Sequence, residues 1–488
     1  MKFESVQGGD CMSENIPEAI SYENIKITGY EVQSIKKLEI DSLINNHSTL
    51  NLTGILNKEN IDDIDSTTNN KIVEVYYNNG NRETIFCGIV VEIEIDVEDE
   101  VYEIKLKAKS MTYLMDIKRK SRSFQDITLS MQDIINDVMS NYDNSNFIVK
   151  IPDKAIGELI IQYEETDWEF LCRLVSKYNI GLIPKMNNNV VSYIAGDCNE
   201  SKVFNNSNNS YEVFKDMKEY EDIKMNHLND AKEYDYTTYK IRNYSIYNLG
   251  DCINIKGINL YAYECKYKMQ DGILENTYKF RMLNGLRQKY LFNTKITGAS
   301  ISGKLVNVKN TLVQIHLDID ESEHNDVYWF DFSTMSASSN GSGWYFMPEI
   351  GDCIRVYFPT KYEQEAFAIS AVSDYKQGES EKEDRMSNPD NKYLRTKNDK
   401  EVKLTQDGIY ISCNSGQADM IVKSDGTVNI LSKNNICVTG EKNIKIEAGK
   451  SIKMTSLKSL EISCDKNGGI IIDEEGLVKE IGSHVFNN

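Results

Sequence analysis

The 488-residue sequence predicts a mainly β protein with a few helices: an α+β hub containing β-barrel-like domains, then an OB-fold barrel, then repetitive β-structure. Three observations support this prediction. Runs such as ENIKITGYEV and VYEIKLKAKSM alternate apolar and polar residues with the period of a strand. Two segments have the period of an amphipathic helix. Residues 435–466 repeat with a period of eight, which indicates a repeat architecture.

The repeat consists of four consecutive octads, NICVTGEK, NIKIEAGK, SIKMTSLK and SLEISCDK, with no insertion. Positions two and four of each octad are aliphatic or Met, and position eight is Lys. Because alternate residues share one face of a strand, each octad is predicted to be a short strand followed by a turn. The apolar residues of this face are Ile436, Val438, Ile444, Ile446, Ile452, Met454, Leu460 and Ile462.

One chain cannot close such a narrow column around its own apolar stripe. Full burial of the eight side chains would stabilise the structure by at most about 12–24 kcal/mol per chain. An exposed apolar stripe would instead promote aggregation. We therefore predict that three copies wind around a common axis into a trimeric β-helical needle with these residues as its core. An ordinary β-meander or a single-chain solenoid is the alternative.

The composition bounds the function. A hydrophobic content of 40% and an aromatic content of 10% are typical of globular proteins. The formal charge of −20 argues against nucleic-acid binding as the main role. The sequence contains no run of 18 apolar residues, and its start, MKFESVQGGD, lacks the apolar core of a signal peptide. We therefore expect synthesis in the cytoplasm. The ten cysteines include no C-x-x-C pair and are expected to be reduced.

The first two predicted domains are a polar N-terminal lead, residues 1–18, and a hub-like domain, residues 19–293. Asn79-Gly80 lies between two alternating runs and predicts a hairpin turn. In the second run, alternate residues from Glu92 to Glu98 are acidic. This acidic face is interpreted as a solvated, edge-protecting surface, with a wall of a central channel as the alternative.

Two helices are expected in the hub. The first follows Ser130, which forms a capping pair with Asp133. The second follows Thr166, whose capping box is completed by Glu169. The apolar stripes predicted for the two helices are Met131, Ile134, Ile135, Val138 and Met139 in the first, and Leu171, Leu174, Val175 and Tyr178 in the second.

The rest of the chain divides into three parts. Residues 294–373 contain several short strands with Gly-bearing turns, as expected for an OB-fold barrel. Residues 374–391 are a charged linker, and residues 392–488 form the β-helical needle with its octads. The tryptophans Trp168, Trp329 and Trp344 are predicted to be core aromatics.

Three pieces, in this order, resemble the VgrG family of spike proteins from type VI secretion and other contractile injection systems. Residues 162–174, QYEETDWEFLCRL, are similar to the hub motif Q-Y-x-E-S/T-D-x-x-F-L-x-R-L of that family. Residues 343–358, which begin GWYFMPEIGD, are similar to its barrel motif P-R-I-G-x-x-V-x-V-x-F. The octad repeat is the third piece. A phage-like tail particle and a type VI secretion apparatus both fit this resemblance.

The resemblance implies a non-enzymatic homotrimeric hub and spike at the tip of a contractile machine. Such a protein pierces the target envelope and anchors the tube and the baseplate. The implied partners are the tube protein, baseplate components, a small PAAR-like tip protein and an effector, with only transient contact with the target envelope and none with nucleic acid. The chain would assemble in the cytoplasm into an injection particle and be expelled on contraction.

Catalytic, metal-binding and cofactor-binding residues are not predicted. His47, His227, His316, His324 and His484 form no H-E-x-x-H motif and no pair with Cys at ligand spacing. His316 is expected to be a partly buried strand residue. A nucleophile elbow or phosphate-binding loop is also absent. The alternative function is a tail-associated cell-wall hydrolase or a receptor-binding adhesin.

Overall fold

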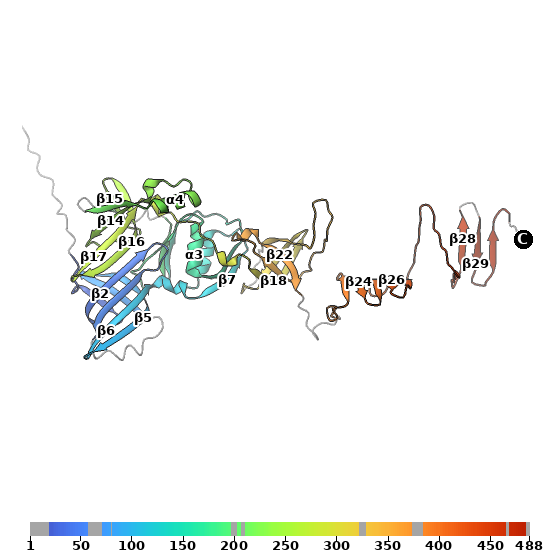
Figure 1. Cartoon of the computed structure of the whole chain (residues 1–488), viewed down its shortest axis with the longest axis horizontal. Helices are drawn as coiled ribbons and strands as arrows, with labels where there is room; N and C mark the ends of the chain where they lie inside the picture. The colour runs from blue at the N-terminus through green and yellow to red at the C-terminus, as the bar shows by residue number, and fades with distance from the viewer. Residues whose placement is uncertain are drawn as a thin grey trace, which may run out of the picture. The chain divides into compact units, whose positions relative to one another are not determined.

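The computed structural model describes residues 19–56, 71–79, 81–196, 203–205, 210–321, 328–372, 384–464 and 468–484. The predicted N-terminal lead and most of the predicted linker lie outside these residues. The chain divides into two compact units, residues 1–374 and 375–488. Figure 1 shows that strands dominate both units, which confirms the mainly β prediction.

The first unit begins with the hub sheet, a continuous sheet of twelve strands. Its two halves meet where β2 pairs with β16. The first half contains β1 (Ile25–Thr28), β2 (Val32–Leu43), β3 (Thr49–Leu56), β4 (Ile72–Asn79), β5 (Asn81–Glu98) and β6 (Val101–Ser110). The second contains β12 (Val203–Asn205), β13 (Tyr211–Lys215), β14 (Thr237–Asn243), β15 (Cys252–Ile255), β16 (Ile258–Gln270) and β17 (Ile273–Arg281).

A single hydrophobic core joins both halves of the hub sheet. It includes fully buried residues of the first half, such as Leu38 and Ile40, and of the second, such as Tyr267 and Phe280. Four short helical segments accompany the second half and the connection that follows it. They are α4 (Met217–Asn226), η3 (Glu233–Tyr236), η4 (Leu283–Leu286) and η5 (Thr294–Ile296).

The hairpin predicted at Asn79-Gly80 is confirmed, because β4 and β5 pair antiparallel up to Asn79 and Asn81. Beyond residue 90, β6 is the only partner of β5 among the described strands. The acidic side chains there pair with lysines of β6: Lys107 lies 2.7 Å from Glu92, and Lys105 lies 3.3 Å from Glu94. These exposed ion pairs agree with a solvated edge surface.

Residues 111–196, the middle segment, lie between the two halves of the sheet in sequence. The caps predicted for α2 and α3 are both confirmed: the hydroxyls of Ser130 and Thr166 accept hydrogen bonds from the amides of Asp133 and Glu169. The elements are η2 (Met111–Asp116), β7 (Arg119–Phe124), α2 (Met131–Met139), β8 (Asn146–Val149), β9 (Ile160–Thr166), α3 (Asp167–Ser176), β10 (Leu182–Pro184) and β11 (Ser192–Ala195).

A closed barrel completes the first unit and lies within the residues for which an OB-fold was predicted. Its strands are β18 (Ser300–Lys309), β19 (Leu312–Leu317), β20 (Trp329–Phe332), β21 (Cys353–Tyr357) and β22 (Phe367–Val372), with η6 (Glu363–Glu365) before the last. His316 is a half-buried residue of β19, as predicted. The prediction for Trp344 is wrong in the single chain, because this residue lies on an exposed loop between β20 and β21.

The second unit contains two antiparallel sheets. The first is a meander of β23 (Lys392–Arg395), β24 (Lys400–Thr405), β25 (Gly408–Cys413), β26 (Ala418–Lys423) and β27 (Val428–Ser432). The second contains β28 (Leu460–Cys464), β29 (Gly468–Ile472) and β30 (Val478–Ile481). This meander precedes the octads, for which a meander or a single-chain solenoid was the alternative to a trimeric needle. Neither sheet is a β-helix within one chain, so the trimeric needle remains a prediction.

Candidate functional site

The two-stranded ribbon of β7 and β9 connects two hydrophobic cores of the first unit. Successive side chains from Leu159 into β9 point to opposite faces, as they do in a strand. Ile160 packs in the core of the middle segment with α2 and α3. Its neighbours Leu159 and Ile161 pack in the core of the barrel. We call this ribbon, with α3 and the barrel residues that it contacts, the hub–barrel joint.

A buried arginine connects the two sides of the joint. Arg173 of α3 donates hydrogen bonds to Glu165 (Nη2–Oε2, 2.7 Å) and to the carbonyl of Ile161 (2.7 Å). It also donates to Glu363 of η6 in the barrel (Nη1–Oε1, 2.9 Å). Burial alone would lower the pKa of Arg173, but the two carboxylates outweigh burial and raise it. The arginine therefore remains charged and holds one carboxylate from each side of the joint.

Glu363 is the barrel's contribution to this cluster. Only 6% of its surface is exposed. Burial raises the pKa of Glu363, whereas the charge of Arg173 opposes that rise. Removing one partner of a buried charge pair costs far more than the pair itself contributes, because a charge is then left unpaired. The joint thus depends on Arg173 being present.

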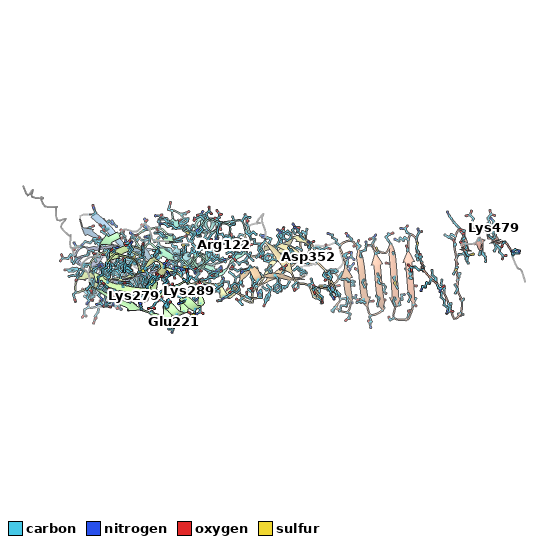
Figure 2. All side chains as sticks on the ribbon, turned by 90° about the horizontal axis from the view of Figure 1, so that it is seen from above. Arg122, Glu221, Lys279, Lys289, Asp352 and Lys479 are labelled. Atoms are coloured by element: carbon cyan, nitrogen blue, oxygen red, sulfur yellow. The ribbon has the colours of Figure 1, made fainter. Side chains whose placement is uncertain are left out.

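A second buried cluster surrounds Asp167, the first residue of α3. Its carboxylate accepts hydrogen bonds from Lys120 (2.6 Å), Arg122 (3.0 Å), Tyr142 (2.7 Å) and Gln162 (3.0 Å). Figure 2 labels Arg122, which comes from β7. A carboxylate at a helix N-terminus is also favoured by the helix dipole. These contacts fix the start of α3 against the ribbon.

Further hydrogen bonds cross the joint directly. The amide and the hydroxyl of Ser123 donate to the two carboxylate oxygens of Asp320, at 2.6 and 2.5 Å. Gln125 donates to the carbonyl of Ile315 (3.1 Å) and accepts from the amide of Tyr328 (3.2 Å). Polar and apolar contacts therefore hold the middle segment and the barrel in one fixed arrangement.

The sequence motif of residues 162–174 is explained by these contacts. Gln162, Glu165, Asp167 and Arg173 all belong to the two buried clusters, and Thr166 caps α3. Each of the motif's polar positions therefore has a structural task. The partner Glu363 was not singled out from the sequence, because an acidic residue 190 positions away carries no local signal.

A cavity of about 450 Å³ lies beside the joint, lined by residues that include His47, Asp116 and Trp168. His47 contacts Thr112 (Nδ1–Oγ1, 2.8 Å) and Asp116 (Nε2–Oδ2, 3.3 Å). The nearby Cys172 is buried, and burial raises the pKa of its thiol, so it is no activated nucleophile. Groups of three potential metal ligands do not occur among the described residues.

The second unit differs from the first in having no core. None of the residues described between 384 and 484 is buried. Aliphatic side chains are nevertheless frequent there. A folded unit of this length normally buries most of its apolar side chains.

The meander of the second unit gathers its aliphatic residues on one face. The strand register places Val402 opposite Ile411, and Ile411 opposite Met420. Figure 2 shows the five strands side by side. The residues that share this face by register and by alternation are Leu394, Val402, Leu404, Ile409, Ile411, Met420, Val422, Val428 and Ile430. We did not single these residues out from the sequence, although their alternation was visible.

The backbone of the octads repeats as their sequence does. Two-residue bends occur at 433–434, 441–442, 449–450 and 457–458, separated by six residues each time. In Figure 1 this segment, between β27 and β28, is drawn without arrows. Within the described part of the chain, the backbone of residues 435–456 makes no hydrogen bond to other backbone groups. Each of the first three octads thus has the predicted length and ends in a bend, but the backbone of residues 435–456 has no backbone partner among the described residues.

The eight predicted needle residues are not brought together in one core. Seven of them are exposed, from 52% for Ile452 to 71% for Val438, and Leu460 is half-buried. Leu460 and Ile462 lie in β28 and pair with Ile472 and Ile470 of β29. The octad stripe and the aliphatic face of the meander together form the apolar surface of the second unit.

Comparison with known proteins agrees with this fold. Residues 46–240 match the phage tail baseplate hub (GPD) family. This range contains β3 to β6, the middle segment and the start of the second half of the hub sheet, as far as β14. The match spans less than half of the chain. Comparison with curated proteins finds no match to this sequence. The hub part of the chain is therefore similar to the hubs of phage tail baseplates.

Solved structures extend the likeness to VgrG-like proteins and confirm the resemblance predicted from the motifs. The chain is similar to the E. coli c3393 protein, a type VI secretion component with structural similarity to the T4 tail proteins gp27 and gp5. The TM-score is 0.53 at 11% identity, over 72% of this chain and 99% of that one. It is also similar to a lidless PdpA–VgrG complex, with a TM-score of 0.52 at 13% identity, over 83% and 97% of the two chains.

The chain is similar to a half-lidded Francisella PdpA–VgrG complex as well. Its TM-score is 0.52 at 12% identity, over 84% of this chain and 87% of that one. At these identities the likeness establishes the fold, which is that of VgrG-like hub and spike proteins. Among the described residues, none of the helices has the length and apolarity needed to span a membrane.

Proposed function

We propose that the protein is the homotrimeric hub and spike of a contractile injection machine. The first unit of each chain contributes one third of a hub and a barrel collar. The second unit supplies one wall of a needle, whose core consists of Ile436, Val438, Ile444, Ile446, Ile452, Met454, Leu460 and Ile462. On contraction the needle pierces the target envelope, while the hub anchors the tube and the baseplate.

The observation that carries this proposal is the second unit without a buried core. Aliphatic side chains that remain half exposed would contribute little to the stability of a lone chain. The backbone of residues 435–456 also has donors and acceptors without backbone partners among the described residues. Further copies of the same chain can cover the aliphatic side chains and can pair with the free backbone groups, because they supply segments with the same period of eight.

Three copies fit the octads better than two. Each octad presents only two apolar side chains per strand, a stripe too narrow to be covered from one side. Three such stripes around one axis enclose a continuous apolar column. The backbone groups of each chain then pair with those of its neighbours. The resemblance to VgrG-like proteins, which implies a homotrimer, agrees with this arrangement.

The hub–barrel joint suits a protein that transmits force. Its two buried ion clusters and its two shared cores leave no free hinge between the middle segment and the barrel. A push applied to the hub is therefore passed on to the barrel without bending. The chain performs no covalent chemistry in this account, and rigidity is the property that function requires.

The proposed partners are the tube protein, baseplate components, a small PAAR-like tip protein and an effector. A further bound protein, in the place of an effector, is supported by the likeness to a VgrG that forms a complex with PdpA. Electron microscopy of particles from the source cell tests the proposal. We expect a label on this chain at the baseplate end of the tube, and expect tubes without it to lack a spike. A label found elsewhere on the particles, and not at the baseplate end, would contradict the proposal.

The alternative function as a cell-wall hydrolase has a direct test. A zymogram with cell-wall substrate is run on the purified protein. We expect no clearing. Clearing that disappears on substitution of a single carboxylate would show that the protein is an enzyme.

A further inference from the structure

The first three octads, with Lys433 just before them, carry a concentration of positive charge that the needle core does not explain, whereas the fourth octad has two acidic residues and one lysine. Between residues 433 and 458 the chain has six lysines and only two acidic residues, Glu441 and Glu447. The formal charge of this segment is therefore +4, whereas the whole chain carries −20. The lysines are Lys433, Lys442, Lys445, Lys450, Lys453 and Lys458, and all six are exposed.

These lysines cannot share the apolar side of the octads. Lys445 and Lys453 occupy position three, which faces away from positions two and four in an extended strand. Lys442, Lys450 and Lys458 occupy position eight, where the backbone bends. Any assembly that buries the apolar stripe therefore leaves the lysines on the outer surface.

The positive charge is largely uncompensated by the chain itself. Lys445 lies 2.6 Å from Glu447. Within the described residues, the other five lysines have no carboxylate at ion-pair distance. The Debye length is only about 8 Å at physiological ionic strength, so the acidic charge of distant parts of the chain is screened. An approaching anionic surface is attracted by residues 433–458, whereas the rest of the chain carries net negative charge.

We propose that the outer lysines of the octads bind the phosphate headgroups of anionic lipids in the target membrane. The inference rests on the proposed function, which brings the needle into an envelope. Lysines near an anionic bilayer surface attract it additively, so each one strengthens binding. A ladder repeated along the needle on three chains would hold its shaft against the headgroup layer and guide its entry.

The experiment compares binding of the full-length protein to two kinds of vesicles by flotation. One kind contains phosphatidylglycerol and phosphatidylcholine in equal parts, and the other contains phosphatidylcholine alone. We expect binding to the anionic vesicles only, and weaker binding as the salt concentration rises. The variant K442Q/K450Q/K458Q should bind at least about tenfold more weakly, since each trimer loses nine charges.

The matched control removes the same charge elsewhere. Lys36, Lys37 and Lys266 are half-exposed lysines of the hub sheet, each paired with a carboxylate. The variant K36Q/K37Q/K266Q should bind the anionic vesicles as the unchanged protein does. Equal losses in the two variants would overturn the inference, because only net charge would then matter.

Two further results would overturn it. Binding to phosphatidylcholine vesicles at the same level would show that headgroup charge is irrelevant. Binding abolished by inorganic phosphate at the lipid's phosphate concentration would assign the lysines to a free anion instead of a membrane. Light scattering on the same samples separates this inference from the proposed function. If the protein is a trimer that does not bind anionic vesicles, only the lipid interaction is refuted. If the protein is a monomer, the hub-and-spike proposal is refuted.

Discussion

The hub–barrel joint and the second unit differ in whether their aliphatic side chains are buried and their polar groups are paired within one chain. In the joint, Ile160, Ile161 and Asp167 are fully buried, and each polar group has a partner from the same chain. In the second unit, Ile446 is 64% exposed and the backbone around it is unpaired among the described residues. The first region is complete as one chain. In the proposed trimer the second is completed by further copies, so the proposal places the assembly interface there.

The largest effect is expected where the second unit depends on other copies. Replacing Ile444 and Ile452 by Asp would place charges inside the needle core, and an unpaired buried charge is strongly unfavourable. We expect the trimer to be lost, together with its resistance to heat and to SDS. Light scattering and gel mobility measure both properties.

The matched control changes the opposite face of the same strands. Lys445→Ser and Lys453→Ser alter position three, which points away from positions two and four. The trimer should keep its mass and its melting temperature. If the Asp variant behaves like the Ser variant, the apolar stripe is not a shared core.

Deletions test the period of the octads. Removing residues 443–450 takes out one whole octad, so we expect a shorter needle that remains trimeric. Removing residues 443–446 instead brings turn positions where apolar positions belong, and a shift in register exposes the core side chains. We expect the shorter deletion to disrupt the trimer, as measured by light scattering. Equal tolerance of both deletions would contradict a fixed period of eight.

A smaller effect is expected in the joint, where every group is already paired. Arg173→Met leaves Glu165 and Glu363 buried without their cation. Breaking a buried pair in this way costs about 3–5 kcal/mol of stability, seen as a lower melting temperature of the first unit. Arg119→Met is the control, since Arg119 is about half exposed in its pair with Glu169 and should cost less than about 1 kcal/mol.

The Arg173→Met defect should depend on pH. Burial already raises the pKa of Glu363, and losing the arginine raises the folded-state pKa further above its unfolded value. A carboxyl group of this kind destabilises the fold at high pH, and the penalty shrinks as pH falls through the folded-state pKa. The difference in melting temperature from the unchanged protein should therefore be smaller near about pH 5 than near about pH 7.5. A difference that is constant with pH would contradict the role of the two carboxylates.

The smallest effect is expected at a helix cap. Thr166→Ala removes the hydroxyl that accepts from the amide of Glu169, which should cost about 1 kcal/mol. Thr128, whose hydroxyl donates to Asp126 in an exposed turn, provides the control. Thr128→Ala should change the melting temperature less. Equal small changes would mean that the cap adds nothing to the stability of the joint.

Local sequence signals predicted local structure well. The caps at Ser130 and Thr166 and the hairpin at Asn79 follow from short-range chemistry, and the structure has each of them. The joint could not be predicted in the same way, because Glu363 meets Arg173 only after the barrel has folded. Trp344 was misassigned because an aromatic residue on an exposed loop has the same sequence pattern as a core aromatic. The aliphatic face of the meander was not predicted, because its strands lack the fixed period of the octads.

The mass of the intact protein in solution tests the central claim most directly. Light scattering coupled to size exclusion should give three times the mass of one 55.9 kDa chain, unchanged on dilution. A stable, soluble species with the mass of one chain would contradict the account, because the apolar surface of the second unit would then need no partner.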